Sequence, residues 1–153
     1  MTGTLFDLTF YLAAPFWALM IVAPRWRWTT RVIGSPWIAL PPLLVYLALA
    51  PGDFAELWTV VSRPDLGVLR EFLASAEGAA MIWAHLIAFD LFIGRWMYLD
   101  ARRRGVPHLL LAPILVLTIL LSPIGLLAYL LARTVTPGAR RLHDREREDQ
   151  PAQ

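Results

Sequence analysis

The chain has 153 residues, of which 58% are hydrophobic and 17% charged, and its mean hydropathy is +0.54. This composition is typical of a small integral membrane protein with one domain and argues against an ordinary soluble domain. The absence of cysteine excludes disulfides, cysteine-ligated metals and thiol catalysis, and the formal charge of +2 gives no reason to expect a nucleic-acid partner.

Two apolar segments near the start of the chain are predicted to span the membrane. Residues 5–23 match the roughly 20 residues that cross a hydrocarbon core, and no signal-peptide cleavage pattern follows them. Residues 34–50 form the second predicted span, whose first turn we expect to be irregular because the segment contains several prolines. Between the two, residues 25–31 combine arginine with tryptophan, as expected where lipid headgroups meet water.

Residues 53–78 mix charged and apolar side chains and are therefore not predicted to cross the membrane. Their apolar residues recur at helical spacing, as Phe54, Leu57, Trp58 and Val61 in one helix and Leu66, Leu69, Leu73 and Ala76 in the next. We expect two short amphipathic helices that lie on the membrane surface between the second and third spans.

Two further apolar segments, residues 79–99 and 109–132, are the third and fourth predicted spans, and a basic turn over residues 100–108 joins them. The sequence thus predicts an all-α, polytopic membrane protein with four transmembrane helices in residues 1–133. Residues 134–153 are charged and poor in apolar side chains, so we expect a disordered tail. The numbers of arginines on the two sides of the membrane are nearly equal. The two short turns, residues 25–31 and 100–108, have the denser arginine clusters, which favours an orientation with both termini outside.

Asp90 is the residue of the third span that most needs an explanation. An aspartate near the centre of a membrane helix costs about 2.5 to 3.5 kcal/mol on insertion scales, so it marks a functional site or a polar contact between helices. His85 lies in the same span, about 140° around the helix from Asp90, and we therefore expect each to have its own partner. Both a structural and a functional role remain open for either residue.

Four aromatic residues lie along the third span: Trp83, Phe89, Phe92 and Trp96. Together they can form the wall of a groove for a long, flat apolar ligand, although ordinary helix packing is the more frequent use of such residues. Gly94 permits the close approach of either a neighbouring helix or a flat ligand.

No metal or cofactor is predicted. Asp100 and His108 are at most a two-ligand fragment, and no His-rich motif completes a metal site. Haem held between helices needs two axial ligands, whereas His85 is the one histidine within a predicted span. Salt bridges and snorkelling to the interface explain Arg95, Asp100 and the arginines that follow.

The pattern H-x4-D-L-F-x-G-R-W-x3-D, which starts at His85, and the later S-P-I-G-L-L resemble the abscisic-acid-deficient-four-like membrane protein family. The resemblance is strongest over residues 83–133 and extends weakly to P-R-W-R-W-T near the N-terminus. Plant plastid members are implicated in neoxanthin formation, the isomerisation of an epoxy-xanthophyll to an allenic one. The resemblance therefore implies a carotenoid or another isoprenoid lipid as ligand, but it brings no established catalytic residues.

The implied isomerisation delivers one proton to oxygen, removes one from carbon and needs no redox cofactor. From the sequence we assign Asp90 as the candidate acid and His85 as the candidate base. The candidate substrate-binding residues are Trp83, Phe89, Phe92, Gly94 and Trp96. Whether the protein is an enzyme stays open.

A non-catalytic membrane scaffold or assembly module is the alternative, with Asp90 as an interhelical polar contact. Transport is less favoured because one midplane acid is present and no inverted repeat is visible. The expected partners are membrane lipids, a carotenoid or isoprenoid ligand, and either a second copy or another protein. The short chain has no transit-peptide pattern, which favours the inner (plasma) membrane of a bacterium.

Overall fold

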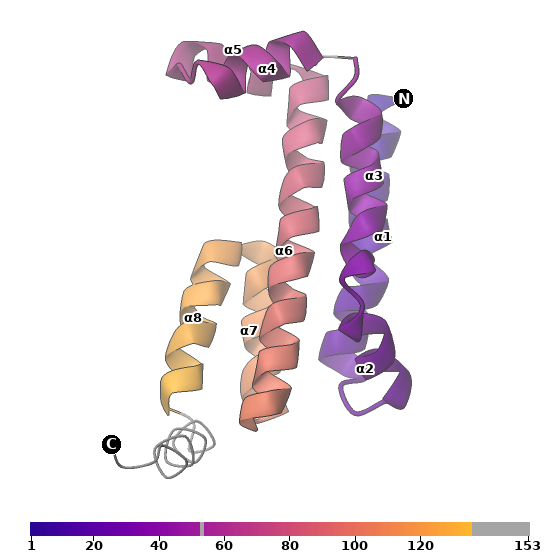
Figure 1. Cartoon of the computed structure of the whole chain (residues 1–153), viewed down its shortest axis with the longest axis vertical. Helices are drawn as coiled ribbons and strands as arrows, with labels where there is room; N and C mark the ends of the chain where they lie inside the picture. Colours follow the sequence, from indigo (N-terminus) through magenta and orange to yellow (C-terminus); the bar gives the residue numbers. More distant parts are fainter. Residues whose placement is uncertain (53, 136–153) are drawn as a thin grey trace, which may run out of the picture. The chain divides into compact units, whose positions relative to one another are not determined.

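A computed structural model describes residues 1–52 and 54–135. Every regular element in these ranges is helical, which confirms the all-α class. The elements, shown in Figure 1, are α1 (Thr2–Val22), α2 (Arg27–Gly34), the 3₁₀ helix η1 (Pro36–Ala39), α3 (Leu40–Leu49), α4 (Phe54–Ser62), α5 (Leu66–Ala74), α6 (Ala76–Arg104), α7 (His108–Leu120) and α8 (Ser122–Val135). The predicted tail falls almost entirely on residues outside the described ranges, so the boundary at residue 133 stays a prediction.

The contacts divide the chain into two compact units, which we describe separately. Unit 1 comprises Met1–Phe16 and Pro36–Phe92, and unit 2 comprises Trp17–Ser35 and the described residues from Ile93 onward. Both α1 and α6 contribute residues to each unit, because the boundaries fall inside these two helices.

The prediction of four transmembrane helices is only partly supported. In the described chain, Thr2–Val22 and Ala76–Arg104 are long and apolar enough to cross a membrane. A third candidate exists if the interrupted pair Arg27–Gly34 and Pro36–Leu49 counts as one span. The irregular start predicted for the second span is confirmed, since Pro36–Ala39 forms a 3₁₀ helix rather than an α-helix.

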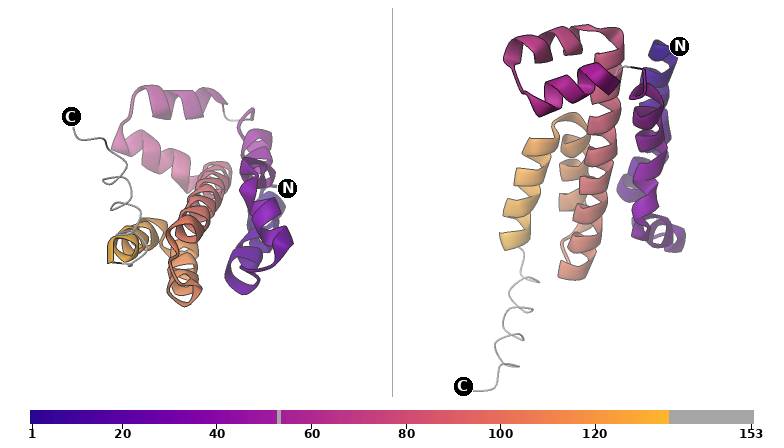
Figure 2. Two further views of the ribbon diagram at one scale, coloured as in Figure 1. Left: turned by 60° about the horizontal axis from the view of Figure 1, so that its bottom comes forward. Right: turned by 45° about the horizontal axis from the view of Figure 1, so that its top comes forward.

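The predicted fourth span is instead a hairpin of two short helices, α7 and α8, which pack side by side in Figure 2. The helix stops at Leu121, which has φ −145° and ψ 72°. Pro123 explains the stop, because its nitrogen cannot donate a hydrogen bond and its ring clashes with the carbonyl one turn earlier. The hydropathy of the segment does not reveal this break, since both halves are apolar.

Gly125 allows α8 to turn back so tightly against α7. A Cβ atom at this position would overlap the backbone and the hydroxyl of Thr118. Thr118 is fully buried, and its hydroxyl donates to the carbonyl of Ile114 at 2.8 Å. Glycine is therefore required by the close approach of the two helices.

In unit 1, α4 and α5 lie across the N-terminal end of α6 (Figure 1). The two amphipathic helices predicted between the second and third spans are therefore present. Their buried residues join a core with α3 and α6: Val45, Leu49, Ala50, Val60, Phe72, Ala80, Met81 and Ala84. Asp65 begins α5, because its carboxylate accepts hydrogen bonds from the N–H groups of Gly67 at 2.8 Å and Val68 at 3.1 Å.

In unit 2, α6 ends at a glycine in the left-handed conformation. Gly105 has φ +70°, and the following Val106 donates its N–H to the carbonyl of Ala101 at 2.9 Å. This pattern closes the last turn of a helix and satisfies a carbonyl that has no partner within the helix. It sets the direction of the short connection to α7.

Candidate functional site

The seven candidate site residues fall into both units. Trp83, His85, Phe89, Asp90 and Phe92 belong to unit 1, whereas Gly94 and Trp96 belong to unit 2. The two groups therefore have different neighbours, although all seven residues are on α6.

His85 lies in an aromatic cluster of unit 1. Its ring stacks on Phe89 with 4.6 Å between ring centroids and 10° between ring planes, as the four-residue spacing on one helix predicts. Tyr46 of α3 meets His85 edge-on at a centroid distance of 6.0 Å. The side chain is half-buried, so the imidazole is held between two helices while part of it stays accessible.

An apolar groove of about 210 Å³ lies beside this cluster. Its lining comes from η1, α3 and α6 and consists of Ala39, Leu43, Ala88, Phe89 and Phe92. Pockets for drug-sized ligands usually measure 300–1,000 Å³, so this groove takes only part of a long molecule. Phe89 is 54% exposed and Phe92 47%, and both offer an apolar surface on which the remainder can continue. Two of the predicted substrate-binding residues, Phe89 and Phe92, thus line an apolar groove.

Asp90 follows Phe89 in the helix but is not among the residues that line the groove. Its side chain is half-buried and is engaged in an interaction within the structure. Helix geometry keeps it about 140° from His85, so one small reacting group cannot contact both residues through a single face of α6. The catalytic assignments of these two residues stay predictions.

Trp83 packs against α1 rather than into the groove. Its ring stacks on Phe6 with a centroid distance of 5.2 Å and an interplanar angle of 24°. The indole Nε1 is buried and, in the described part of the chain, has no hydrogen-bond partner. Such a donor is uncommon in a folded protein, because leaving it unpaired costs about 1 to 3 kcal/mol.

Gly94 and Trp96 make packing contacts in unit 2. A Cβ atom on Gly94 would overlap the ring of Trp17, so this glycine admits an indole from α1. Trp96 meets Tyr129 edge-on at 5.5 Å, and the guanidinium of Arg133 lies 5.4 Å from the Trp96 ring centroid. These contacts favour the helix-packing alternative for both residues over a direct role in ligand binding.

Asp100 is the centre of a polar cluster that joins α6 to α8. It accepts a hydrogen bond from the Tyr129 hydroxyl at 2.7 Å and pairs with Arg104 at 3.0 Å and with Arg133 at 3.5 Å. The salt bridge predicted at this interface is thus present. His108 contacts a different partner, because its Nε2 donates to the carbonyl of Ile21 at 2.9 Å. The described residues contain no group of three metal-ligating side chains.

Arg95 is a structural residue whose role the sequence did not reveal. Its guanidinium donates to the carbonyls of Ile33 at 2.9 Å, Ser35 at 3.2 Å and also Gly34. These carbonyls end α2, where the helix leaves acceptors unpaired and carries partial negative charge. The sequence predicts snorkelling and ordinary salt bridges for Arg95, whereas the structure shows that it caps a helix. No local pattern signals it, since the partners are about 60 residues away.

A backbone carbonyl just beyond the end of α1 also accepts hydrogen bonds from side chains of α6. The Tyr98 hydroxyl donates to the carbonyl of Pro24 at 2.7 Å, and Nη1 of Arg102 donates to the same oxygen at 2.8 Å. In the second half of the sequence motif, the polar side chains of Arg95 and Asp100 thus make structural contacts. In the first half of the motif, Phe92 lines the groove and His85 adjoins it through its stacking on Phe89.

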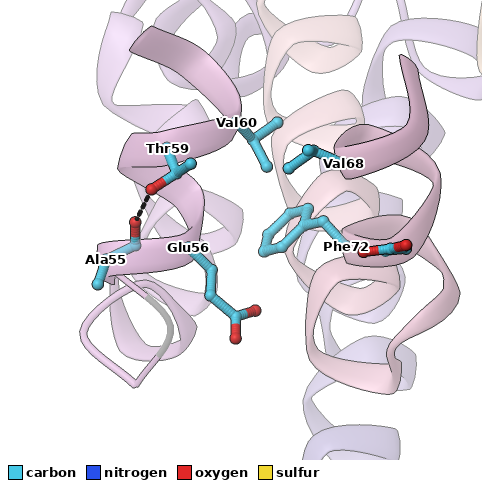
Figure 3. Close-up of a pocket in the computed structure, with 7 residues that line it drawn as sticks. Ala55, Glu56, Thr59, Val60, Val68 and Phe72 are labelled. Carbon is cyan, nitrogen blue, oxygen red and sulfur yellow. Dashed lines mark hydrogen bonds between the residues drawn. The ribbon is translucent and has the colours of Figure 1, made fainter. Parts of the chain in front are cut away.

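A second cavity in unit 1, of about 520 Å³, lies between α4 and α5 and is shown in Figure 3. Val60, Val68 and Phe72 provide its apolar side, and Glu56 and Glu71 line it as well. Thr59 donates its hydroxyl to the carbonyl of Ala55 at 2.8 Å, so that hydroxyl serves its own helix. The two glutamates are exposed to solvent, as charged side chains usually are, so their presence at the edge of the cavity needs no functional explanation.

Comparisons with known proteins agree with the sequence resemblance. The chain is 28% identical over 127 residues to "Protein ABA DEFICIENT 4, chloroplastic" of Arabidopsis thaliana, an alignment that covers 79% of this chain and 56% of the relative. It thus spans little more than half the length of that protein. No solved structure matches. The model of the ABA DEFICIENT 4-like family matches residues 4–129, and the chain therefore belongs to this family.

Proposed function

We propose that this chain is an integral membrane protein that binds a carotenoid or another isoprenoid lipid in the apolar groove of unit 1. The observation that carries the proposal is the lining of the groove, which contains no polar side chain and includes two half-exposed phenylalanines. A polyene offers only apolar surface over most of its length, so burial against such a lining is favourable. Membership of the family, whose plant members are implicated in neoxanthin formation, supports this ligand class.

The membrane location is supported by length and by exposure. Two helices are long and apolar enough to span a bilayer, and many of their large apolar side chains are exposed in the isolated chain. Exposure on this scale is unusual for a soluble monomer, whereas lipid tails cover such surfaces readily. The inner membrane of a bacterium is the membrane proposed for this chain, whereas its relative carries a chloroplastic name.

The finer proposal is a cofactor-independent isomerisation of an epoxide to an allenic alcohol. The epoxide C–O bond breaks, Asp90 gives a proton to the oxygen, and His85 accepts the proton lost from carbon, so atoms and charge balance. His85 adjoins the groove through its stacking on Phe89. Because Asp90 and His85 lie on different faces of α6, the two transfers require a substrate that extends past both faces or that moves between them.

Absorption spectroscopy tests the binding proposal directly. The full chain, expressed in a carotenoid-producing host and purified in detergent, is expected to retain a coloured polyene. Replacing Phe89→Ala or Phe92→Ala removes a wall of the groove and should lower the pigment-to-protein ratio severalfold. Leu86→Ala is the matched control, since Leu86 is 46% exposed on the same helix and does not line the groove. A colourless wild-type preparation, or an equal loss with Leu86→Ala, contradicts the proposal.

A non-catalytic scaffold is the second candidate, and one observation favours it specifically. Gly94, Arg95, Trp96 and Asp100 all make structural contacts, so half of the motif is explained without a reaction. Incubation with an epoxy-xanthophyll separates the two candidates. An allenic product that accumulates only with the wild-type chain favours the isomerase, whereas a bound but unchanged pigment favours the scaffold.

A further inference from the structure

Unit 2 contains two adjoining cavities where α1 ends and α7 begins. Their volumes are about 500 and 230 Å³, and Pro24, Arg25 and His108 line both. Arg102 also lines the smaller one. These cavities belong to a different unit from the isoprenoid groove and share no residue with it.

The charge around these cavities is uncompensated. Neither lining contains an acidic residue, although each contains at least one arginine. Asp100, the nearest acid in sequence, is already paired with Arg104 and Arg133. In the part of the chain that the structure describes, Arg25 makes no ion pair or hydrogen bond. An anion is therefore the ligand that this environment favours.

Two of the polar side chains that line these cavities, Arg102 and His108, are held in position by the fold. Nη1 of Arg102 is anchored on the Pro24 carbonyl, while its Nε and Nη2 bond nothing among the described residues. His108 is fixed through Nε2 to the Ile21 carbonyl. In the first turn of α7, Leu110 and Leu111 donate their N–H groups to the carbonyl of Pro107, which leaves those of His108 and Leu109 as the helix N-terminal donors that add partial positive charge.

Apolar side chains lie beside the arginines. Val22 is 80% exposed and Leu109 is 91% exposed, and both line the larger cavity. A free phosphate ion leaves these surfaces in water, whereas an acyl chain covers them. Basic pockets that adjoin apolar helix surfaces at a membrane boundary are suited to anionic lipid headgroups.

We propose that these cavities bind an anionic phospholipid, with its phosphate at Arg25 and Arg102 and an acyl chain against Val22 and Leu109. The site rests on the membrane location proposed above but not on isoprenoid binding, because it uses none of the groove residues. A pigment-free preparation can therefore still bind the phospholipid, and the two proposals can fail separately.

Native mass spectrometry of the full chain in neutral detergent tests the site. Phosphatidylglycerol and phosphatidylcholine are titrated separately, and the apparent affinity of each is read from the bound population. Inorganic phosphate is then added to the phosphatidylglycerol complex as a competitor. We expect tight retention of phosphatidylglycerol, weak retention of phosphatidylcholine and no displacement by inorganic phosphate. Equal retention of the two lipids overturns the proposal, and so does displacement of the lipid by inorganic phosphate.

Two neighbouring arginines provide matched variants. Arg25→Gln removes a charge from the lining and should weaken phosphatidylglycerol binding about fivefold, whereas Arg25→Lys should retain most of the affinity. Arg103→Gln removes the same charge from an exposed residue that lines neither cavity and should change little. Equal losses with Arg25→Gln and Arg103→Gln show a diffuse basic surface instead of a site and overturn the proposal.

Discussion

Arg95 shows how a cation in a largely apolar helix can be used entirely for backbone hydrogen bonds. Its planar guanidinium meets three successive carbonyls at the end of α2, with donors fixed in a fork that a compact ammonium group lacks. Asp90, five residues earlier on α6, is only half-buried and lies next to the groove residue Phe89. The contacts of Arg95 therefore explain it within the fold, whereas for Asp90 a structural contact and a catalytic role are both still candidates.

Arg95→Met is expected to lower the free energy of unfolding by about 3 kcal/mol, because charged hydrogen bonds are lost and the carbonyls of α2 remain partly buried. Thermal unfolding in detergent measures the change. Arg103→Met, on the same helix, is the control and should stay within about 0.5 kcal/mol of the wild type, since Arg103 is exposed. Similar shifts for both variants contradict the helix-capping role.

Asp90→Asn is expected to slow conversion of an epoxy-xanthophyll by about 10²- to 10⁴-fold, because the amide cannot donate the proton that the carboxyl donates. Protein accumulation and melting temperature should not change. Asp7→Asn replaces a carboxyl in the other long apolar helix and should preserve conversion. If Asp90→Asn instead unfolds the protein, the aspartate is an interhelical contact and the catalytic assignment is wrong.

At the scale of elements, close approaches at glycine decide which helices pack together. Gly94 admits the ring of Trp17 in unit 2, and Gly125 admits the backbone of α7. Both contacts depend on the missing Cβ atom rather than on any attractive side chain. The close packing at these two positions is thus possible because glycine has no side chain to obstruct the neighbouring helix.

Gly125→Ala is expected to destabilise the α7–α8 hairpin by about 1 to 3 kcal/mol, because the added methyl group overlaps Thr118 and cannot be relieved by rotating one side chain. Gly3→Ala is the control. No atom lies within 4 Å of a Cβ there, and alanine favours the helix, so stability should stay the same or rise slightly. A tolerated Gly125→Ala would show that the hairpin is looser than described.

At the scale of the whole molecule, the chain separates an apolar groove in unit 1 from a polar, arginine-rich set of contacts in unit 2. The second unit contains the α7–α8 hairpin in place of a full membrane span. This difference changes the expected topology, because the two ends of a hairpin lie on the same side whereas the two ends of a span do not.

Cysteine labelling tests this topology without interference, since the chain has no cysteine of its own. Arg103→Cys precedes the hairpin and Thr134→Cys ends it, and both positions are exposed. In intact membranes, both should react with an impermeant maleimide from the same side. Reaction from opposite sides would restore a transmembrane segment over residues 109–132.

The local pattern of the sequence was sufficient for much of the fold. The apolar lengths of α1 and α6, the two amphipathic helices and the irregular proline-rich start before α3 all follow from spacing and composition. For the site, the four-residue spacing of His85 and Phe89 predicted their shared face, which their stacking confirms. Such features depend on neighbours within a few residues, so they are readable without a structure.

By itself, then, the sequence determined the all-helical class, the two longest helices and membership of the family. Only the tertiary structure decided that the fourth apolar segment folds back on itself, that Arg95 caps α2, and that Phe89 and Phe92 line a groove with residues of η1 and α3. The physical reason is the distance in sequence between the interacting residues. Periodicity records which side of a helix is apolar, but a close approach at glycine or a hydrogen bond to a distant carbonyl exists only once separate helices are in contact.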